Sequence, residues 1–199
     1  MSVSALTQRH RAQQLLLRNG TQAQVRRIWP KLEYERLDAT YPAFALAAAA
    51  LVEKNRLTSA GLTLGYLREF RGEAGIPGVA RLVKAGAVPA EQFTGSLIAT
   101  SIAPIKKATT AGTLAEVSMS NALTQTSGAL ARLVLNGGRE TLTASVAADP
   151  AGRGYRRVLG GGGCDFCQML AGRGGVYTED TADFEAHDSC GCSAEPIYG

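Results

Sequence analysis

The sequence predicts a mainly α-helical protein, with a helical N-terminal body and a small C-terminal α+β module that resembles a zinc knuckle. Alanine, leucine and glycine are abundant while aromatic residues make up only 6% of the chain, which favours helices packed through small side chains. Apolar residues recur at helical spacing up to about residue 150, and short β-prone runs follow. All four cysteines lie in that last part. We therefore divide the chain into a helical body, residues 1–150, and a metal-binding module, residues 151–199.

The first helical region is expected over residues 4–29. Leucines follow a helical spacing as far as Gly20, which is expected to end the pattern, and Thr21 could cap its continuation. Pro30 then forces a kink or a stop. His10 is flanked by two arginines, so we expect it to be exposed, with no role as a ligand.

Two helices are expected next, separated near Thr58 or Ser59, either of which could cap the second. Pro42 is expected to open the first of them, in which consecutive alanines permit close packing. Residues 72–78 read as a loop because of their glycines and proline, and residues 79–84 as a short helix. A further helix, with Pro89 in its first turn, is expected to run on to Pro104. One face of this helix is apolar and consists of Phe93, Leu97, Ile98 and Ile102.

The longest predicted helix begins at a capping box, Thr113-Leu114-Ala115-Glu116, and ends at Gly137-Gly138. A last helix over residues 139–147 and a linker over residues 149–154 complete the predicted body. In the module, β-prone runs cover residues 155–159, 175–178 and 194–198, and residues 166–171 could form a helical turn.

The module contains five candidate metal ligands, in the pattern C-x2-C followed by H-x2-C-x-C. They are Cys164, Cys167, His187, Cys190 and Cys192. A C-x2-C turn aims two sulfurs at one point, and a structural Zn²⁺ takes four ligands, so one of the five is in excess. The spacing favours Cys192 as the spare. The predicted cofactor is therefore a structural zinc ion.

Two disulfides, free thiols or an iron–sulfur cluster are the alternatives to zinc. Disulfides suit secreted chains, but residues 1–20 lack the apolar core of a signal peptide. A histidine among the cysteines fits zinc better than an iron–sulfur cluster.

The C-terminal residues resemble the signature of the Mu protein F-like minor head proteins of tailed bacteriophages, in the version found in phages of actinobacteria. The residues that carry this resemblance are Gly154-Tyr155-Arg156-Arg157-Val158, Cys164, Cys167, Leu170, Ala171, Arg173-Gly174-Gly175-Val176-Tyr177, Phe184, His187, Cys190, Cys192 and Pro196. Gly191 departs from it, since many relatives have arginine there. The resemblance implies metal binding through the cysteines and the histidine, and a place inside the head near the portal.

Charge is distributed unevenly about a net charge of +4. The basic N-terminal region includes Arg9, Arg11, Arg18, Arg26 and Arg27, while the region after residue 160 is mostly acidic. These arginines could contact DNA phosphates without sequence preference, although a solvated helix face is the simpler interpretation of each of them. No aromatic residues alternate with them, so base stacking is not supported.

Two functional classes follow. The first is a phage minor capsid protein, which binds the portal protein and capsid or scaffold proteins and acts in head assembly and in DNA packaging or ejection. It would lie in the capsid interior at the portal vertex of the virion, and in the host cytoplasm during assembly. The alternative is a zinc-stabilised, non-enzymatic nucleic-acid-binding protein.

An enzyme is not expected, since the chain has no P-loop, no nucleophile elbow and only two histidines. No apolar run is long enough to span a membrane.

Overall fold

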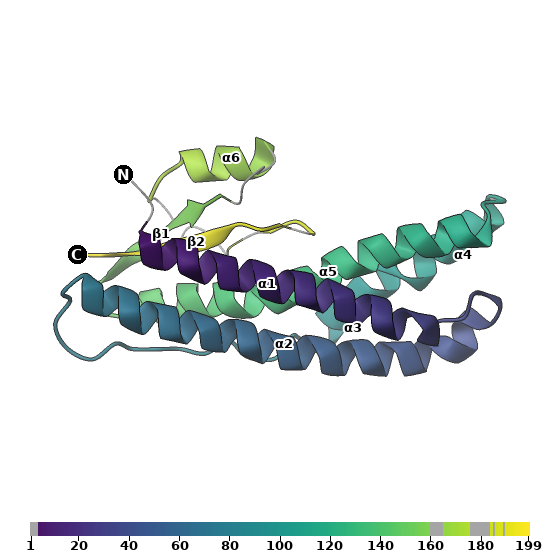
Figure 1. Cartoon of the computed structure of the whole chain (residues 1–199), viewed down its shortest axis with the longest axis horizontal. Helices are drawn as coiled ribbons and strands as arrows, with labels where there is room; N and C mark the ends of the chain where they lie inside the picture. Colours follow the sequence, from purple (N-terminus) through teal and green to yellow (C-terminus); the bar gives the residue numbers. More distant parts are fainter. Residues whose placement is uncertain (1–3, 160–164, 176–183, 185, 189) are drawn as a thin grey trace.

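A computed structural model describes residues 4–159, 165–175, 184, 186–188 and 190–199. Three long helices lie side by side along the long axis of the molecule: α1 (Ala5–Ile28), α2 (Leu37–Glu73) and α5 (Ala115–Ala148) (Figure 1). The shorter helices α3 (Ala90–Thr100) and α4 (Ile102–Thr110) pack against α5. Strands β1 (Gly152–Val158) and β2 (Ser193–Tyr198) form an antiparallel pair, and α6 (Asp165–Gly172) packs on β1. The prediction of a mainly helical fold with a small C-terminal α+β part is confirmed.

Helix α1 runs without interruption through Gly20, so the predicted break there is wrong. Thr21 does not cap a new helix, because its hydroxyl is buried and donates to the Leu17 carbonyl one turn earlier. The Asn55 amide on α2 donates to the same hydroxyl at 3.0 Å, which ties the two helices together. The predicted stop at Pro30 is confirmed: α1 ends at Ile28 and passes into the 3₁₀ turns Trp29–Lys31 and Tyr34–Arg36.

Helix α2 is one continuous helix where two were predicted, and it begins before Pro42. Thr58 donates back to the Lys54 carbonyl, and Ser59 donates to Gln14 on α1, so neither residue caps a helix end. The predicted helix over residues 79–84 is also wrong. That segment has no helical structure, and the Val83 N–H donates to the Ser145 hydroxyl on α5 at 2.9 Å.

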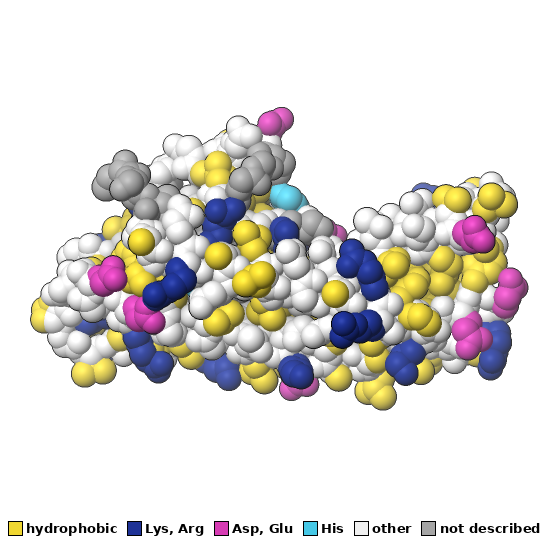
Figure 2. Space-filling view, viewed as in Figure 1, with side chains coloured by type: hydrophobic (Ala, Val, Ile, Leu, Met, Phe, Trp, Pro, Cys, Tyr) yellow, Lys and Arg dark blue, Asp and Glu magenta, His cyan; other side chains and the backbone are white. Residues whose placement is uncertain are grey.

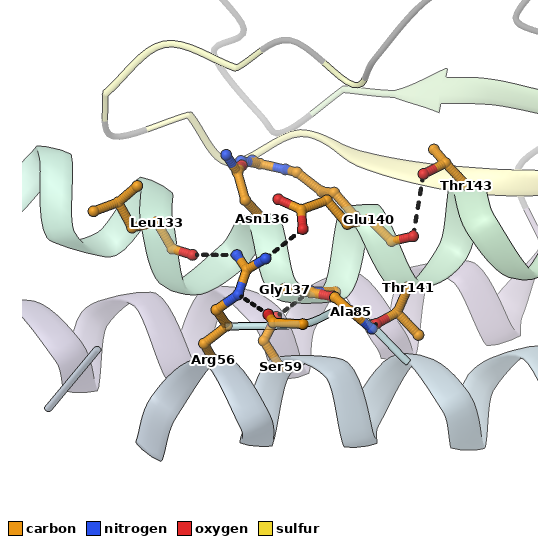
Figure 3. Close-up of polar contacts among 12 residues, drawn as sticks. Arg56, Ser59, Ala85, Leu133, Asn136, Gly137, Glu140, Thr141 and Thr143 are labelled. Carbon is orange, nitrogen blue, oxygen red and sulfur yellow. Dashed lines mark hydrogen bonds and ion pairs between the residues drawn. The ribbon is translucent and has the colours of Figure 1, made fainter. Parts of the chain in front are cut away.

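The predicted helix up to Pro104 is two helices, because α3 ends at Thr100 and Pro104 lies in the first turn of α4. Helix α5 begins at Ala115 without a side-chain cap, so the predicted capping box is not formed. It then continues past Gly137-Gly138, where a stop was predicted. These glycines mark instead the close crossing of α5 with α2: a Cβ on Gly137 would lie 2.7 Å from the Arg56 carbonyl oxygen. Figure 3 shows this crossing, with the Arg56 guanidinium directed at Leu133 and Glu140.

Gly137→Ala should therefore destabilise the protein, although alanine is a better helix former than glycine by about 1 kcal/mol. The added methyl group meets main chain that cannot move independently, and overpacking of this kind costs about 1–3 kcal/mol. Gly20→Ala is the matched control, because Gly20 is helical with no heavy atom within 4 Å of the added Cβ. Urea denaturation should show a lower free energy of unfolding for Gly137→Ala and a slightly higher one for Gly20→Ala. Equal stabilisation of both variants would contradict the close crossing.

Residues from the predicted module and the predicted body share one hydrophobic core. Leu6, Tyr66, Leu142 and Val146 from α1, α2 and α5 pack in the same cluster as Tyr155, Cys167, Leu170, Phe184, Cys190 and Cys192. The predicted linker is wrong, since Asp149 is buried and Gly152–Gly154 begin β1. That residues 1–150 and 151–199 fold independently of each other stays a prediction. The core that they share argues against it.

The other predictions for the C-terminal residues are mostly confirmed. The β-prone runs at residues 155–159 and 194–198 correspond to β1 and β2, and the helical turn at residues 166–171 lies in α6. Of the run at residues 175–178, only Gly175 is among the described residues. None of the described helices combines the length and the apolar character needed to cross a bilayer.

Candidate metal centre

Three cysteine side chains from two segments meet in the core beneath α6. Cys167 lies on α6, while Cys190 and Cys192 lie on the segment that leads into β2. All three are buried, and their sulfur atoms lie within 4.8 Å of one another. Cys164, the first of the candidate ligands, is outside the described residues. The structure thus brings together three of the five candidates as one cluster of thiols.

The distances in this cluster match those between the ligands of a tetrahedral metal. Cys167 Sγ lies 3.8 Å from Cys190 Sγ. A tetrahedral Zn²⁺ with Zn–S bonds of about 2.3 Å holds two sulfurs about 3.8 Å apart, whereas a disulfide requires about 2.05 Å. No disulfide joins the three described cysteines to one another. The residues present therefore fit a metal ion, and a cross-link between these two sulfurs does not fit.

His187 adds a nitrogen to one side of the thiol cluster. Its Nε2 lies 3.3 Å from Cys167 Sγ, and its Nδ1 lies 2.8 Å from the Asp188 carbonyl oxygen. A carbonyl oxygen only accepts, so Nδ1 carries the proton and the lone pair of the neutral ring is on Nε2. This is the tautomer that histidine uses as a metal ligand with its second nitrogen held by a carbonyl. His187 thus presents the lone pair of Nε2 beside Cys167 Sγ, as a metal ligand requires.

The turn around His187 is held from two directions. The Cys190 N–H donates to the His187 carbonyl at 3.1 Å, which closes the turn. The Arg132 Nε on α5 donates to the Asp188 carboxylate at 2.7 Å. These contacts position His187 and Cys190 relative to α5.

The Cys190 thiol holds its proton tightly. A hydrogen bond with Cys192 and burial raise the pKa of the Cys190 thiol to about 12. Only a thiolate binds a metal, so an incoming cation must displace this proton. Metal affinity at this centre should consequently rise with pH.

Arg139 on α5 lies directly behind the two C-terminal cysteines. Its Nη2 donates to the carbonyl oxygens of Cys190 at 3.0 Å and of Cys192 at 3.1 Å. The guanidinium is buried, and this burial lowers its pKa to about 10, against the opposing effect of the nearby cysteines. Arg139 was not among the sequence candidates, because nothing in its local pattern distinguishes it from other arginines of the helix.

His10 is the other histidine, and the prediction that it is exposed is wrong. It is buried and stacks on the Tyr66 ring, with centroids 4.4 Å apart. Burial lowers its pKa to about 4, so the ring is neutral at pH 7. Its Nε2 lies 3.4 Å from the Thr63 hydroxyl, which places His10 in the packing between α1 and α2.

The arginines proposed for DNA contact do not form a single group. Arg9, Arg26 and Arg27 are exposed, and Arg9 is paired with Glu69. Arg18 is half-buried and donates to Asn19, and Arg11 is half-buried beside a small cavity that Cys192 also lines. On the face shown in Figure 2, apolar and uncharged side chains separate the basic ones.

Comparison with known proteins identifies a family over the full chain. A family model described as "VG15 protein" matches residues 1–199. No curated protein and no solved structure matches the chain.

Proposed function

Because the chain belongs to the VG15 protein family over its whole length, which indicates a bacteriophage protein, we propose that it is a minor capsid protein with a structural zinc site. The observation that carries the zinc site is the cluster of three buried thiols with His187 beside Cys167. The minor capsid role is supported by the resemblance of residues 154–196 to the Mu protein F-like minor head proteins. That role is structural and non-enzymatic.

We propose that Cys167, Cys190 and Cys192 form the constant part of the ligand set, with His187 or Cys164 as the fourth ligand. The mutual distances of the three sulfurs support a place for Cys192, which the spacing alone favoured as the spare. Zinc suits such a set because it accepts both sulfur and nitrogen in tetrahedral geometry. When bound, it would join α6 to the segment before β2 and hold that segment against α5.

In the virion, the protein would lie in the capsid interior at the portal vertex, after assembly in the host cytoplasm. Its partners would be the portal protein and capsid or scaffold proteins, with a role in head assembly and in DNA packaging or ejection. Non-specific contact of Arg26 and Arg27 with double-stranded DNA is compatible with this role, since both side chains are exposed. A purely nucleic-acid-binding role is the alternative.

One experiment separates the two roles. The protein is produced together with its phage's portal, scaffold and major capsid proteins, and heads are purified by sedimentation. We expect the chain to be recovered with the heads, and a variant with Arg26 and Arg27 changed to glutamate to be recovered equally well. If the protein is missing from the heads but binds DNA with an affinity that falls steeply with salt, the nucleic-acid-binding role is correct instead.

A further inference from the structure

We infer that Arg139 compensates the negative charge of the metal centre and thereby positions the ligand segment on α5. This inference rests on the proposed zinc site and goes beyond it, because it assigns part of the metal affinity to the long helix of the body. Metal binding and the packing of residues 190–192 on α5 would then depend on one guanidinium.

The first step is the geometry of Arg139. Its side chain leaves α5 and is buried to 6% exposure at the base of the thiol cluster. One nitrogen donates to the Cys190 and Cys192 carbonyls together, and another donates to the Asn136 amide oxygen at 2.9 Å. Arg139 therefore binds the main-chain carbonyls of two proposed ligands and not their sulfur atoms.

The second step is the charge of Arg139. All its hydrogen-bond acceptors are neutral oxygens, and within the described part of the chain it forms no ion pair with a carboxylate. Other buried arginines differ in this respect: Arg56 pairs with Glu140, and Arg71 with Asp149. A buried cation without an anionic partner is costly, so its environment is expected to supply negative charge in another form.

The third step is the source of that negative charge. Three thiolates and a neutral histidine around a divalent cation leave a net charge of about −1, and four thiolates leave about −2. The loaded centre is therefore anionic whichever fourth ligand it uses. Arg139 is a buried cation in contact with the segment that holds two of these thiolates.

A second guanidinium lies near Arg139, on the same aromatic ring. Arg157 on β1 is buried with its Cζ 3.9 Å from the centroid of the Phe184 ring, and Arg139 Cζ lies 5.1 Å from the same centroid. Two guanidinium groups on one aromatic ring repel each other, and an anionic metal centre beside them offsets this repulsion.

The test compares zinc affinity in purified full-length variants by competition with a chromophoric chelator. Arg139→Met keeps the length of the side chain and removes its charge, and we expect its zinc affinity to fall about 10- to 100-fold. Arg139→Lys keeps the charge and loses the paired donors, so its loss should be smaller. With cobalt in place of zinc, the thiolate-to-cobalt absorption should keep its wild-type shape, because the ligands are unchanged.

Arg56→Met is the matched control, since Arg56 is also a buried arginine that donates to main-chain carbonyls, on Leu133 and Gly86. It should lower the melting temperature while leaving zinc affinity within about twofold of wild type, as expected for a site it does not contact. If Arg139→Met does not fold, Arg139→Lys is used instead, and its zinc affinity should be several-fold lower than that of the wild type. Wild-type affinity in the folded Arg139 variants would overturn the inference and leave the zinc site intact, whereas a wild-type protein that binds no zinc overturns both.

Discussion

Cys167→Ser is expected to abolish zinc binding and to unfold the C-terminal part of the protein at lower temperature. Cys167 Sγ lies 3.8 Å from Cys190 Sγ and 3.3 Å from His187 Nε2. In small zinc domains a structural zinc site supplies about 10–16 kcal/mol of folding free energy, so the loss of one ligand should be costly. Because Cys167 also lies in the core shared with α2 and α5, the loss should reach the helices.

Elemental analysis after gel filtration should find about one zinc per chain in the wild type and none in Cys167→Ser. The melting temperature should fall by about 10 °C or more, which corresponds to a few kcal/mol in a protein of this size. Cys192→Ser should also weaken zinc binding, because Cys192 belongs to the proposed ligand set, and full retention of zinc would identify it as the spare. Ser193→Ala is the control, because the buried Ser193 hydroxyl has no hydrogen-bond partner among the described residues and its removal should cost little. Full zinc content in Cys167→Ser would show that Cys167 is not a zinc ligand.

The helical body could be predicted from periodicity, but its boundaries could not. The sequence analysis treated Gly20 and Gly137-Gly138 as helix ends because glycine lowers helix propensity and often follows a helix. In the structure, α1 and α5 continue through them, and Gly137 is needed for the approach of α2 rather than for a turn. Local propensity was overridden by a contact between residues far apart in the chain, Arg56 and Gly137.

The thiol cluster was predictable because its residues are close in sequence and chemically distinctive. Spacing alone did not show which sulfurs meet, since the path of the chain from His187 to Cys190 depends on the turn at His187 and on the contact of Arg132 with Asp188. The part played by Arg139 depends on how α5 packs against the last residues of the chain. The same holds for His10, whose burial results from stacking on Tyr66 of another helix.

Asp149→Ala is expected to destabilise the whole fold, because it leaves the Arg71 guanidinium buried without its anion. Arg71 Nε donates to Asp149 Oδ2 at 2.8 Å, and the two side chains are only 8% and 2% exposed. The remaining Arg71 nitrogens donate to the carbonyls of Ile76, Pro77 and Gly78. The pair thus joins the end of α2 and the following loop to the end of α5.

The loss for Asp149→Ala should be about 3–5 kcal/mol, the usual cost of removing one partner of a buried ion pair. Asp38→Ala is the control, since Asp38 forms an exposed pair with Lys106 and its loss should cost under about 1 kcal/mol. Urea denaturation of the two variants and the wild type at pH 7 checks this difference. Equal stability of Asp149→Ala and the wild type would show that Arg71 is satisfied by the loop carbonyls alone.

The contribution of Asp149 should also depend on pH. Burial raises the pKa of the Asp149 carboxyl, but hydrogen bonds from Arg71 and from the Ala151 N–H outweigh burial and hold this pKa below its usual value. A group with a lowered pKa in the folded state stabilises the protein above its unfolded pKa, about 3.9, and loses this effect as the pH falls through the folded pKa. The difference in unfolding free energy between wild type and Asp149→Ala should therefore be constant from pH 7 to about pH 5. It should shrink at lower pH, as the carboxylate of the wild type takes up a proton and Arg71 loses its anion in both proteins.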